Sequence, residues 1–373
     1  MGRAAFAHCL FAPCCFPSLH FPTAMKRSLS LLALAAFSIH ASAQNLVTQA
    51  RPAGSEFWGY MDNTGNMIIP PKFKHNFPFN ETGFAAVKDG ATEKAGFINL
   101  KGEMLKTDPA DFMLISGMVK DAQGFSCGLS PVRIGELWGF MNTEGKMAIA
   151  AKYDKVEAFE SCFAVVKLGK QQYILTPDGK ETAIKDPNIV DVKGFEGGLS
   201  PFKQKDKMHG FMDGEQNIVI PAQFLSVGYF SGDLAWAKTK DNKVGFINKK
   251  GEWVITPQFD AAQEFDPVSG MARVKQGDNW MYVAKDGTIM RVADTTVWGD
   301  FSEGLAKGKK GDLIGFFDKT GKWVIEPQFQ GVREFKNGYA AAKQGDLWGF
   351  IDKTGKWVIE PKYEAVKDME KVR

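Results

Sequence analysis

The chain has 373 residues, with 46 Lys and Arg against 43 Asp and Glu and a formal net charge of +3. The first 43 residues contain Arg3, Lys26 and Arg27 and no acid, so the remaining chain is balanced at 43 residues of each sign. Nucleic-acid binding normally needs a clear basic excess. We therefore expect no nucleic-acid partner.

A secretory signal peptide is predicted over residues 25–43. Its basic start is Lys26-Arg27, an apolar run follows from Leu29 to Ile39, and Ala41-Ser-Ala43 has the small residues of a cleavage site. The apolar run is too short to span a bilayer comfortably, which disfavours the alternative of a long disordered or membrane-anchored N-terminus.

This signal peptide places the translation start at Met25, so that residues 1–24 are a start-site overrun. The mature protein is then the single segment 44–373. We expect it to be exported, periplasmic or secreted, and not an integral membrane protein after cleavage.

From Phe57 onward the chain repeats one short block. The stretch from Leu347 to Pro361, LWGFIDKTGKWVIEP, is nearly identical to Ile314 to Pro327, IGFFDKTGKWVIEP. Nine copies, numbered here in chain order, span Phe57–Pro70, Ala95–Glu103, Leu137–Ile149, Gln172–Lys180, Met208–Pro221, Val244–Pro257, Trp280–Thr288, Ile314–Pro327 and Leu347–Pro361. Their mean spacing of about 37 residues is typical of a repeat array.

Each copy predicts three antiparallel strands. In the ninth copy, Trp348–Asp352 and Lys356–Ile359 have the alternating apolar pattern of strands, and Asp352-Lys-Thr-Gly355 has the composition of a tight hairpin turn. The preceding block, Gly338–Lys343, is a third strand. Pro361 follows the second hairpin strand, where we expect it to end the ladder pairing.

The chain is therefore predicted to be all-β, a tandem array of about nine three-stranded antiparallel meanders. Three strands cannot bury both faces alone, so neighbouring copies must complete the core. No strand is obviously left over to close a ring, which favours an open twisted solenoid. A closed propeller-like ring is the alternative.

The Trp-Gly-Phe-Ile-Asp, Gly-x-Trp-Val-Ile-x-Pro and Gly-Leu-Ala-x-Val-Lys blocks together resemble the WG-repeat (KWG) family of bacterial proteins, over about Phe57 to Val366. The resemblance implies a β-strand scaffold, often exported, whose role is thought to be binding and which has no general enzymatic activity. The family positions found here are Trp58, Gly59, Trp138, Gly139, Gly210, Gly245, Gly315, Trp348 and Gly349. Other residues replace the Trp at Ala95, Gln172, His209, Val244 and Ile314, and the Gly at Tyr173 and Met281.

No catalytic constellation is evident. His75 and His209 lie in different copies, and no cluster of His, Cys and carboxylates has metal-ligand spacing. Asp62, Asp213, Asp318 and Asp352 recur at the hairpin turn, with Asn at 99, 142 and 248. These carboxylates could act as an acid and base pair or bind calcium, but Asn as an equal alternative favours turn capping. We predict no enzyme, no cofactor and no metal.

Two tryptophans fall outside the repeat pattern. Trp236 stands where other copies have Ala86, Pro131, Pro201 or Arg273, which suggests an exposed site, and Trp298 lies in an irregular spacer. An exposed aromatic could stack on a sugar or anchor a protein. Periodic tryptophans such as Trp138 are more simply part of the core between copies.

The third strand ends in a cation in eight copies. We name the set Lys88, Arg133, Lys167, Lys203, Lys238, Lys275, Lys309 and Lys343 the cation ladder. It could track an anionic polymer such as an acidic polysaccharide. Alternatively, each cation packs over the Trp five residues later, as for Arg133, Lys275 and Lys343.

Two cysteines remain after the predicted leader, Cys127 and Cys162, at nearly equivalent places in successive copies. Stacked copies could bring them together as a disulfide, which an exported compartment allows. We favour two buried free thiols, with the disulfide as the alternative.

The sequence thus predicts an exported, non-enzymatic scaffold that binds a protein partner at the cell envelope. The alternative is a glycan or anionic polysaccharide binding protein that uses Trp236, Trp298 and the cation ladder. The leader and the family resemblance together indicate a bacterial host.

Overall fold

The computed structural model describes residues 46–114, 124–292, 295 and 298–372, and Trp298 by its backbone alone. The chain divides into residues 1–43 and Gln44–Arg373, and the described residues all belong to the second unit. The predicted overrun and signal peptide lie outside the described residues. Within the described ranges the secondary structure is strand, without a helix, as predicted.

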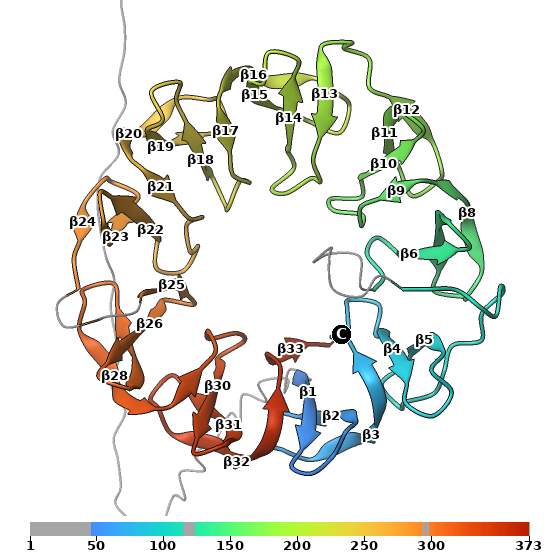
Figure 1. Cartoon of the computed structure of the whole chain (residues 1–373), viewed down its shortest axis with the longest axis vertical. Coiled ribbons are helices and arrows are strands. Elements are labelled where there is room, and N and C mark those ends of the chain that lie inside the picture. Colours follow the sequence, from blue (N-terminus) through green and yellow to red (C-terminus); the bar gives the residue numbers. More distant parts are fainter. Residues whose placement is uncertain (1–45, 115–123, 293–294, 296–297, 373) are drawn as a thin grey trace, which may run out of the picture. The chain divides into compact units, whose positions relative to one another are not determined.

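The strands form small antiparallel sheets (Figure 1). One ten-stranded sheet has the order β29 (Gly331–Val332), β30 (Tyr339–Gln344), β31 (Leu347–Asp352), β32 (Trp357–Val366), β1 (Leu46–Pro52), β2 (Trp58–Asp62), β3 (Met67–Asn76), β4 (Ala85–Asp89), β5 (Ala95–Ile98), with β33 (Glu370–Lys371) paired to β1. A three-stranded sheet contains β6 (Leu129–Ile134), β7 (Leu137–Asn142) and β8 (Met147–Tyr153).

The other sheets are four-stranded. They contain β9 (Lys155–Val156), β10 (Ala164–Leu168), β11 (Gln171–Leu175) and β12 (Glu181–Ala183); β13 (Ile189–Val192), β14 (Ser200–Gln204), β15 (His209–Met212) and β16 (Ile218–Phe224); β17 (Ser226–Val227), β18 (Leu234–Lys238), β19 (Val244–Asn248) and β20 (Trp253–Phe259); β21 (Ala261–Ala262), β22 (Met271–Gln276), β23 (Asn279–Ala284) and β24 (Ile289–Met290); β25 (Trp298–Ser302), β26 (Leu305–Lys310), β27 (Leu313–Asp318) and β28 (Trp323–Phe329).

The predicted meander is present in the ninth copy. β30 pairs with β31, placing Lys343 opposite Trp348, and β31 pairs with β32. Between the hairpin strands the Gly355 N–H donates to the Asp352 carbonyl at 3.0 Å. Gly355 has φ +85°, a left-handed conformation that glycine adopts without steric cost.

A short fourth strand completes most sheets and was missed from the sequence. It follows directly on the second hairpin strand of one copy and pairs with the third-strand block of the next, as β29 does with β30. Figure 1 shows these short strands toward the centre, for example β21, and the second hairpin strand on the outside, as β24. Two residues in a spacer carry no periodicity by which a strand could be recognised.

The recurring proline does not end the pairing, so that expectation is wrong. In the ninth copy Phe350 faces Ile359 and Trp348 faces Tyr363, so Pro361 lies inside β32, at a bulge. Bulges are among the few places where a strand tolerates proline.

This bulge explains the repeat glycine. A Cβ at Gly349 would lie 2.3 Å from the Ile359 carbonyl oxygen, closer than any side chain allows. The other repeat glycines face the equivalent carbonyl at 2.3 to 2.6 Å: Gly59, Gly139, Gly210, Gly245 and Gly315. The facing strand therefore leaves no room for a side chain at these positions.

The hydrophobic core consists of clusters between consecutive copies. Phe316 of the eighth copy shares a cluster with Ile351 of the ninth, and Phe246 of the sixth copy shares one with Val283 of the seventh. Each first hairpin strand therefore buries side chains on both faces, as expected for an array whose units complete one another.

The array closes on itself, which corrects the open solenoid. Ala50 of β1 pairs with Gly59 on one side and with Val366 of β32 on the other, and Phe350 shares a cluster with Met61. Within Gln44–Arg373 the sheets follow one another around a ring, with β1 (blue) beside β32 (red) in Figure 1. The closing strand was visible only as a poor copy of the third-strand block, because its partner is far away in sequence.

Candidate binding surfaces

The hairpin carboxylates cap their own turns, as predicted. Asp352 Oδ1 accepts hydrogen bonds from the Thr354 N–H at 2.8 Å, the Thr354 hydroxyl at 2.6 Å and the Lys356 N–H at 3.2 Å. The Thr354 hydroxyl bond holds the pKa of Asp352 below its usual value. Asn142 and Asn248 make the same turn bonds. Within the described ranges, no group of three or more His, Cys, Asp and Glu could hold a metal ion.

His209, which replaces the repeat Trp, is half-buried on β15 opposite Lys203. Burial lowers the pKa of its imidazole, and the nearby Lys203 acts in the same direction. The residue occupies the structural position of the Trp.

Trp236 is more buried than expected. It lies on β18 opposite Phe246, and its indole covers Gly228 so closely that a Cβ there would be 2.1 Å from Nε1. The ring also packs against the cluster that contains Phe246 and Phe265. Part of the indole surface that was predicted to be free for binding therefore packs against the protein itself. Trp298 begins β25, and its side chain lies outside the description.

All eight members of the cation ladder lie directly opposite the repeat Trp position, including Arg133 opposite Trp138 and Lys343 opposite Trp348. The Arg133 guanidinium lies 6.0 Å from the Trp138 ring centroid, as the packing interpretation predicts. Over Trp280 the cation is Arg273, at 4.6 Å, and not the expected Lys275. A residue two positions earlier on the same strand points to the same face and reaches the ring.

The ladder has two electrostatically different parts. Lys88 pairs with Glu93 at 3.0 Å, Arg133 with Glu136, Lys309 with Asp312 at 3.6 Å and Lys343 with Asp346 at 3.7 Å. In the part of the chain that the structure describes, Lys167, Lys203 and Lys238 have no carboxylate within 4.0 Å. The same holds for Lys275, so the four unpaired members belong to the fourth to seventh copies, which are consecutive around the ring.

Cys127 and Cys162 form a disulfide, with their Cα atoms 5.5 Å apart. Each lies in the two-residue turn that precedes a third strand, so the bond joins the third and fourth copies. Beside it, the Ser126 hydroxyl donates to the Phe159 carbonyl at 2.6 Å.

The same turn-to-turn contact recurs without cysteine. The hydroxyls of Ser231 and Ser302 donate to the Phe265 and Phe335 carbonyls of the next copy, both at 2.7 Å. The Glu303 carboxylate accepts from the Asn337 N–H at 2.6 Å and the Gly338 N–H at 2.9 Å. The recurring Phe-Ser-x-x-Leu spacing was a sequence signal for these contacts that we did not use.

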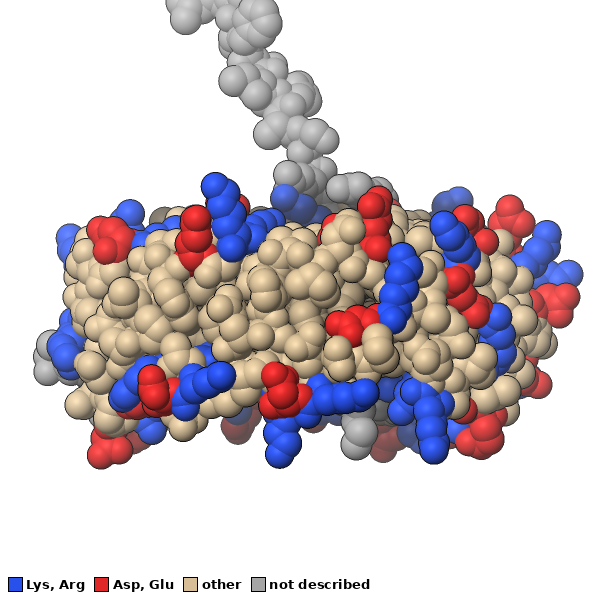
Figure 2. Space-filling view, turned by 90° about the horizontal axis from the view of Figure 1, so that it is seen from above, with Lys and Arg blue, Asp and Glu red and all other residues tan. Residues whose placement is uncertain are grey.

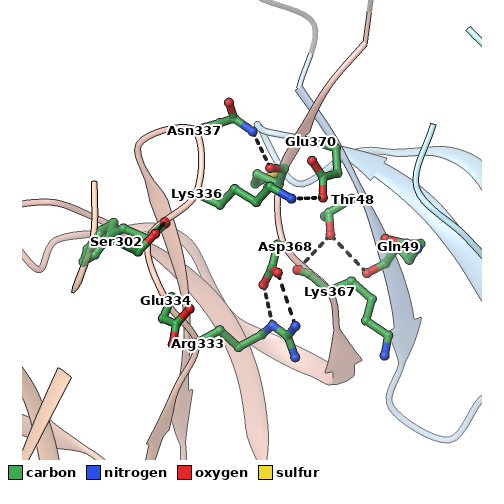
Figure 3. A network of polar contacts seen from close by, with 12 residues as sticks. Thr48, Gln49, Ser302, Arg333, Glu334, Lys336, Asn337, Lys367, Asp368 and Glu370 are labelled. Atoms are coloured by element: carbon green, nitrogen blue, oxygen red, sulfur yellow. Dashed lines mark hydrogen bonds and ion pairs between the residues drawn. The ribbon is translucent and has the colours of Figure 1, made fainter. Parts of the chain in front are cut away.

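A polar network lies where the last strands meet the first (Figure 3). The Thr48 hydroxyl donates to the Lys367 carbonyl at 2.9 Å, and the Arg333 guanidinium forms an ion pair with Asp368. Lys336 pairs with Glu370 at 2.6 Å, and the Asn337 amide donates to the Met369 carbonyl at 2.8 Å. We call this region, formed by β1, β32, β33 and the turn at residues 336–338, the seam.

The outer wall of the ring carries an aliphatic band. Figure 2 shows charged side chains along both rims and few on the wall between them. The band lies on the second hairpin strands and consists of Ile68, Val219, Val254, Val324 and Val358, each between 37% and 45% exposed. These residues precede the buried isoleucine of each copy, so strand alternation directs them outward.

A hollow of about 460 Å³ lies beside the second copy. Its lining includes Phe77, Val87 and Phe112 with Lys88 and Glu93. The second copy lacks the Val-Ile-x-Pro strand, and the irregular segment through residues 104–114 takes that place. The segment that continues from this lining lies outside the described residues.

The fold and these surfaces define an all-β repeat protein whose sheets close into a ring. The chain belongs to the WG-repeat family: the family model for the WG containing repeat matches residues 58–91, 138–171, 210–243, 245–280, 314–348 and 348–371. No curated protein sequence matches the chain. Among the described residues, no helix has the length and apolar character needed to cross a membrane.

Several solved structures are similar to the chain at low sequence identity. A eukaryotic initiation factor structure is 11% identical, with a TM-score of 0.56, 87% of this chain and 98% of that chain covered. Apo AztD from Citrobacter koseri is 10% identical with a TM-score of 0.41, and the match covers 87% of this chain and 97% of that chain. BamB from Moraxella catarrhalis is 10% identical with a TM-score of 0.35, and the match covers 68% of this chain and 91% of that chain. At 11% identity, the likeness to the initiation factor structure shows a similar fold and nothing about function.

Proposed function

We propose that this protein is an exported, non-enzymatic scaffold of nine WG units in a closed ring, which binds a protein partner at the cell envelope. Its location, periplasmic or secreted, follows from the predicted signal peptide. A ring whose core lies between consecutive copies presents a stable, extended surface.

The aliphatic band is the observation that carries the proposal. Soluble proteins usually blunt exposed strand edges with charges, and apolar patches that persist mark interaction sites. Here the wall repeats an exposed valine, such as Val254 at 45%, on successive outer strands. A protein partner offers the apolar surface that such a band would bury.

Glycan or anionic polysaccharide binding is the alternative function. The unpaired cations Lys167, Lys203, Lys238 and Lys275 favour it, and partly buried Trp236 lies on the same strand as Lys238. The ion pairs at Lys88, Arg133, Lys309 and Lys343 argue against a polymer that follows the whole ring, because a paired cation attracts a polyanion weakly.

The test is a pull-down from envelope extract on the immobilised unit Gln44–Arg373, with bound protein identified by mass spectrometry and bound carbohydrate by composition. We expect a specific, saturable protein that is lost with Val324→Ser/Val358→Ser, whose side chains lie outside the core. Lys319→Ser/Lys356→Ser, on exposed hairpin turns of the same copies, is the matched control and should retain it. Recovery of sugar without protein would favour the alternative.

Export is tested separately by fractionating cells that express the full chain or a chain lacking residues 25–43. The full chain should appear in the periplasm or the medium, and the shortened chain should stay in the cytoplasm. Equal cytoplasmic retention of both would contradict the predicted signal.

A further inference from the structure

One rim of the ring carries a cluster of lysines at the turns between the third strand and the first hairpin strand. We call the cluster the basic arc. It consists of Lys167, Lys170, Lys203, Lys205, Lys207, Lys238 and Lys240. The arc covers the fourth to sixth copies, and the equivalent turns of all copies lie at the same rim because every copy has the same strand order.

The arc differs from the rest of this rim in its charge balance. At four of the five other ladder positions an acid pairs with the cation, as Asp312 does with Lys309 and Asp346 with Lys343, whereas Lys275 of the next copy is unpaired like the arc. Within the described ranges, the seven lysines of the arc form no such pair. Their positive charge is therefore available to a ligand.

Of the acids close to the arc, Asp241 is exposed beside Lys240, and four others bind other groups. Asp154 accepts the Gly169 N–H at 2.6 Å, and Asp206 accepts the Met208 N–H at 2.9 Å. Asp191 pairs with Lys193 at 3.0 Å, and Asp260 pairs with Lys243 at 2.7 Å. Within the three turns themselves, seven lysines stand against Asp206 and Asp241, so the arc keeps a positive charge balance.

Apolar side chains lie among the lysines. Leu168 stands between Lys167 and Lys170 and is 38% exposed, and Val190, on the strand paired with β14, is 52% exposed. Trp236 and Lys238 alternate along β18 and share a face. A hydrophilic polyanion would leave these side chains unused, whereas a protein segment with acidic and apolar residues would contact both kinds.

We propose that the basic arc docks an acidic segment of a partner protein, with Leu168, Val190 and Trp236 contacting apolar side chains of that segment. The proposal rests on the proposed scaffold function and names the class of partner and the part of the ring that receives it. Long-range attraction to the lysines would speed the encounter, and the apolar contacts would select a protein over a simple polyanion.

The test titrates the unit Gln44–Arg373 with a fluorescein-labelled peptide in which Glu and Asp alternate with Leu and Phe, read by anisotropy. The arc variant is Lys167→Gln/Lys203→Gln/Lys238→Gln. The control variant, Lys88→Gln/Lys309→Gln/Lys343→Gln, removes the same number of charges at equivalent ladder positions that are ion-paired. We expect the arc variant to weaken binding about tenfold and the control less than about twofold, both effects shrinking at high ionic strength.

Two further probes separate the sources of binding. Leu168→Ser should weaken the mixed peptide and leave polyglutamate binding unchanged. Equal weakening by the arc and control variants would overturn the proposal, since net charge alone would explain it. So would tighter binding of polygalacturonate than of the peptide, which favours a polysaccharide.

Failure of the two proposals can be told apart. A partner that the pull-down recovers equally with wild type and arc variant leaves the scaffold function standing and overturns the arc. Arc-dependent peptide binding without any protein recovered from the extract would support the arc and contradict the scaffold function.

Discussion

Two joints of the ring hold neighbouring copies together by different means. The third and fourth copies are crosslinked by Cys127–Cys162, at a sequence separation of 35. The seam joins the first and ninth copies by noncovalent contacts between residues as far apart as Thr48 and Lys367, at a separation of 319. Closing the longer loop costs about 2 kcal/mol more in chain entropy.

The seam offsets that cost by burial. Leu46, Val366 and Met369 are at most 6% exposed in its cluster, and a buried side chain of this size stabilises by about 1.5–3 kcal/mol. Hydrophobic burial therefore exceeds the entropic difference, and the ring closes without a crosslink. The comparison indicates that the same turn geometry accepts either a covalent or a noncovalent contact.

Deleting residues 367–373 should have the largest effect. It removes β33, the Arg333–Asp368 ion pair and the buried Met369 and Val372. We expect a loss of about 5 kcal/mol or more in the free energy of unfolding. Hydrogen exchange should show the first and ninth copies opening first. Lys371→Ala, on the same strand and exposed, is the control, and an unchanged melting temperature after the deletion would contradict the closed ring.

Replacing the disulfide should have the next largest effect. Cys127→Ser/Cys162→Ser should lower the free energy of unfolding by about 3–4 kcal/mol in the loop-entropy model. Amide hydrogen exchange should become faster in the third and fourth copies and should not change at the seam. Reductant should reproduce the loss in the wild-type protein and leave the double variant unchanged. A uniform increase in exchange around the ring would mean that the joints are not independent.

Substituting a repeat glycine by valine introduces the same steric clash with the facing carbonyl beside each joint. Gly349→Val puts a side chain against the Ile359 carbonyl near the seam, and Gly139→Val does so against the Ile149 carbonyl near the disulfide. Each should cost about 1–3 kcal/mol by overpacking, measured by denaturant unfolding. Gly331→Ala, whose Cβ would be 3.3 Å from its nearest neighbour, is the control. A tolerated Gly349→Val would show that the carbonyl can move.

The smallest expected effect concerns the turn caps, which both joints share. The folded pKa of Asp352 lies below its unfolded value of about 3.9, so its cap stabilises above that pH and is lost as the pH falls through the folded pKa. Asp352→Asn should leave the melting temperature at neutral pH unchanged, as the Asn at 142 and 248 indicates. It should also reduce the fall of the melting temperature at acid pH. A large change at neutral pH would mean that the charge itself is needed.

The local features were predictable because they depend on neighbouring residues. Turn capping by Asp352, the cross-strand pairing of Arg133 with Trp138 and the need for glycine at 349 follow from spacing within one copy. The position of Pro361 inside a strand was not predictable from propensity, since the bulge that admits it depends on the facing strand. Trp236 was expected to be exposed because the sequence does not show that Gly228 lies beneath it.

The sequence by itself determined the repeated unit, its strands and its family, because each copy carries the alternation, turn and glycine that specify a meander. It wrongly favoured an open array and did not decide whether Cys127 and Cys162 pair. Only the tertiary structure decided these points, and it also divided the cation ladder into paired and unpaired parts. The physical reason is range: strand alternation acts over a few residues, whereas ring closure, the disulfide and the ion pairs depend on where separate copies meet in space.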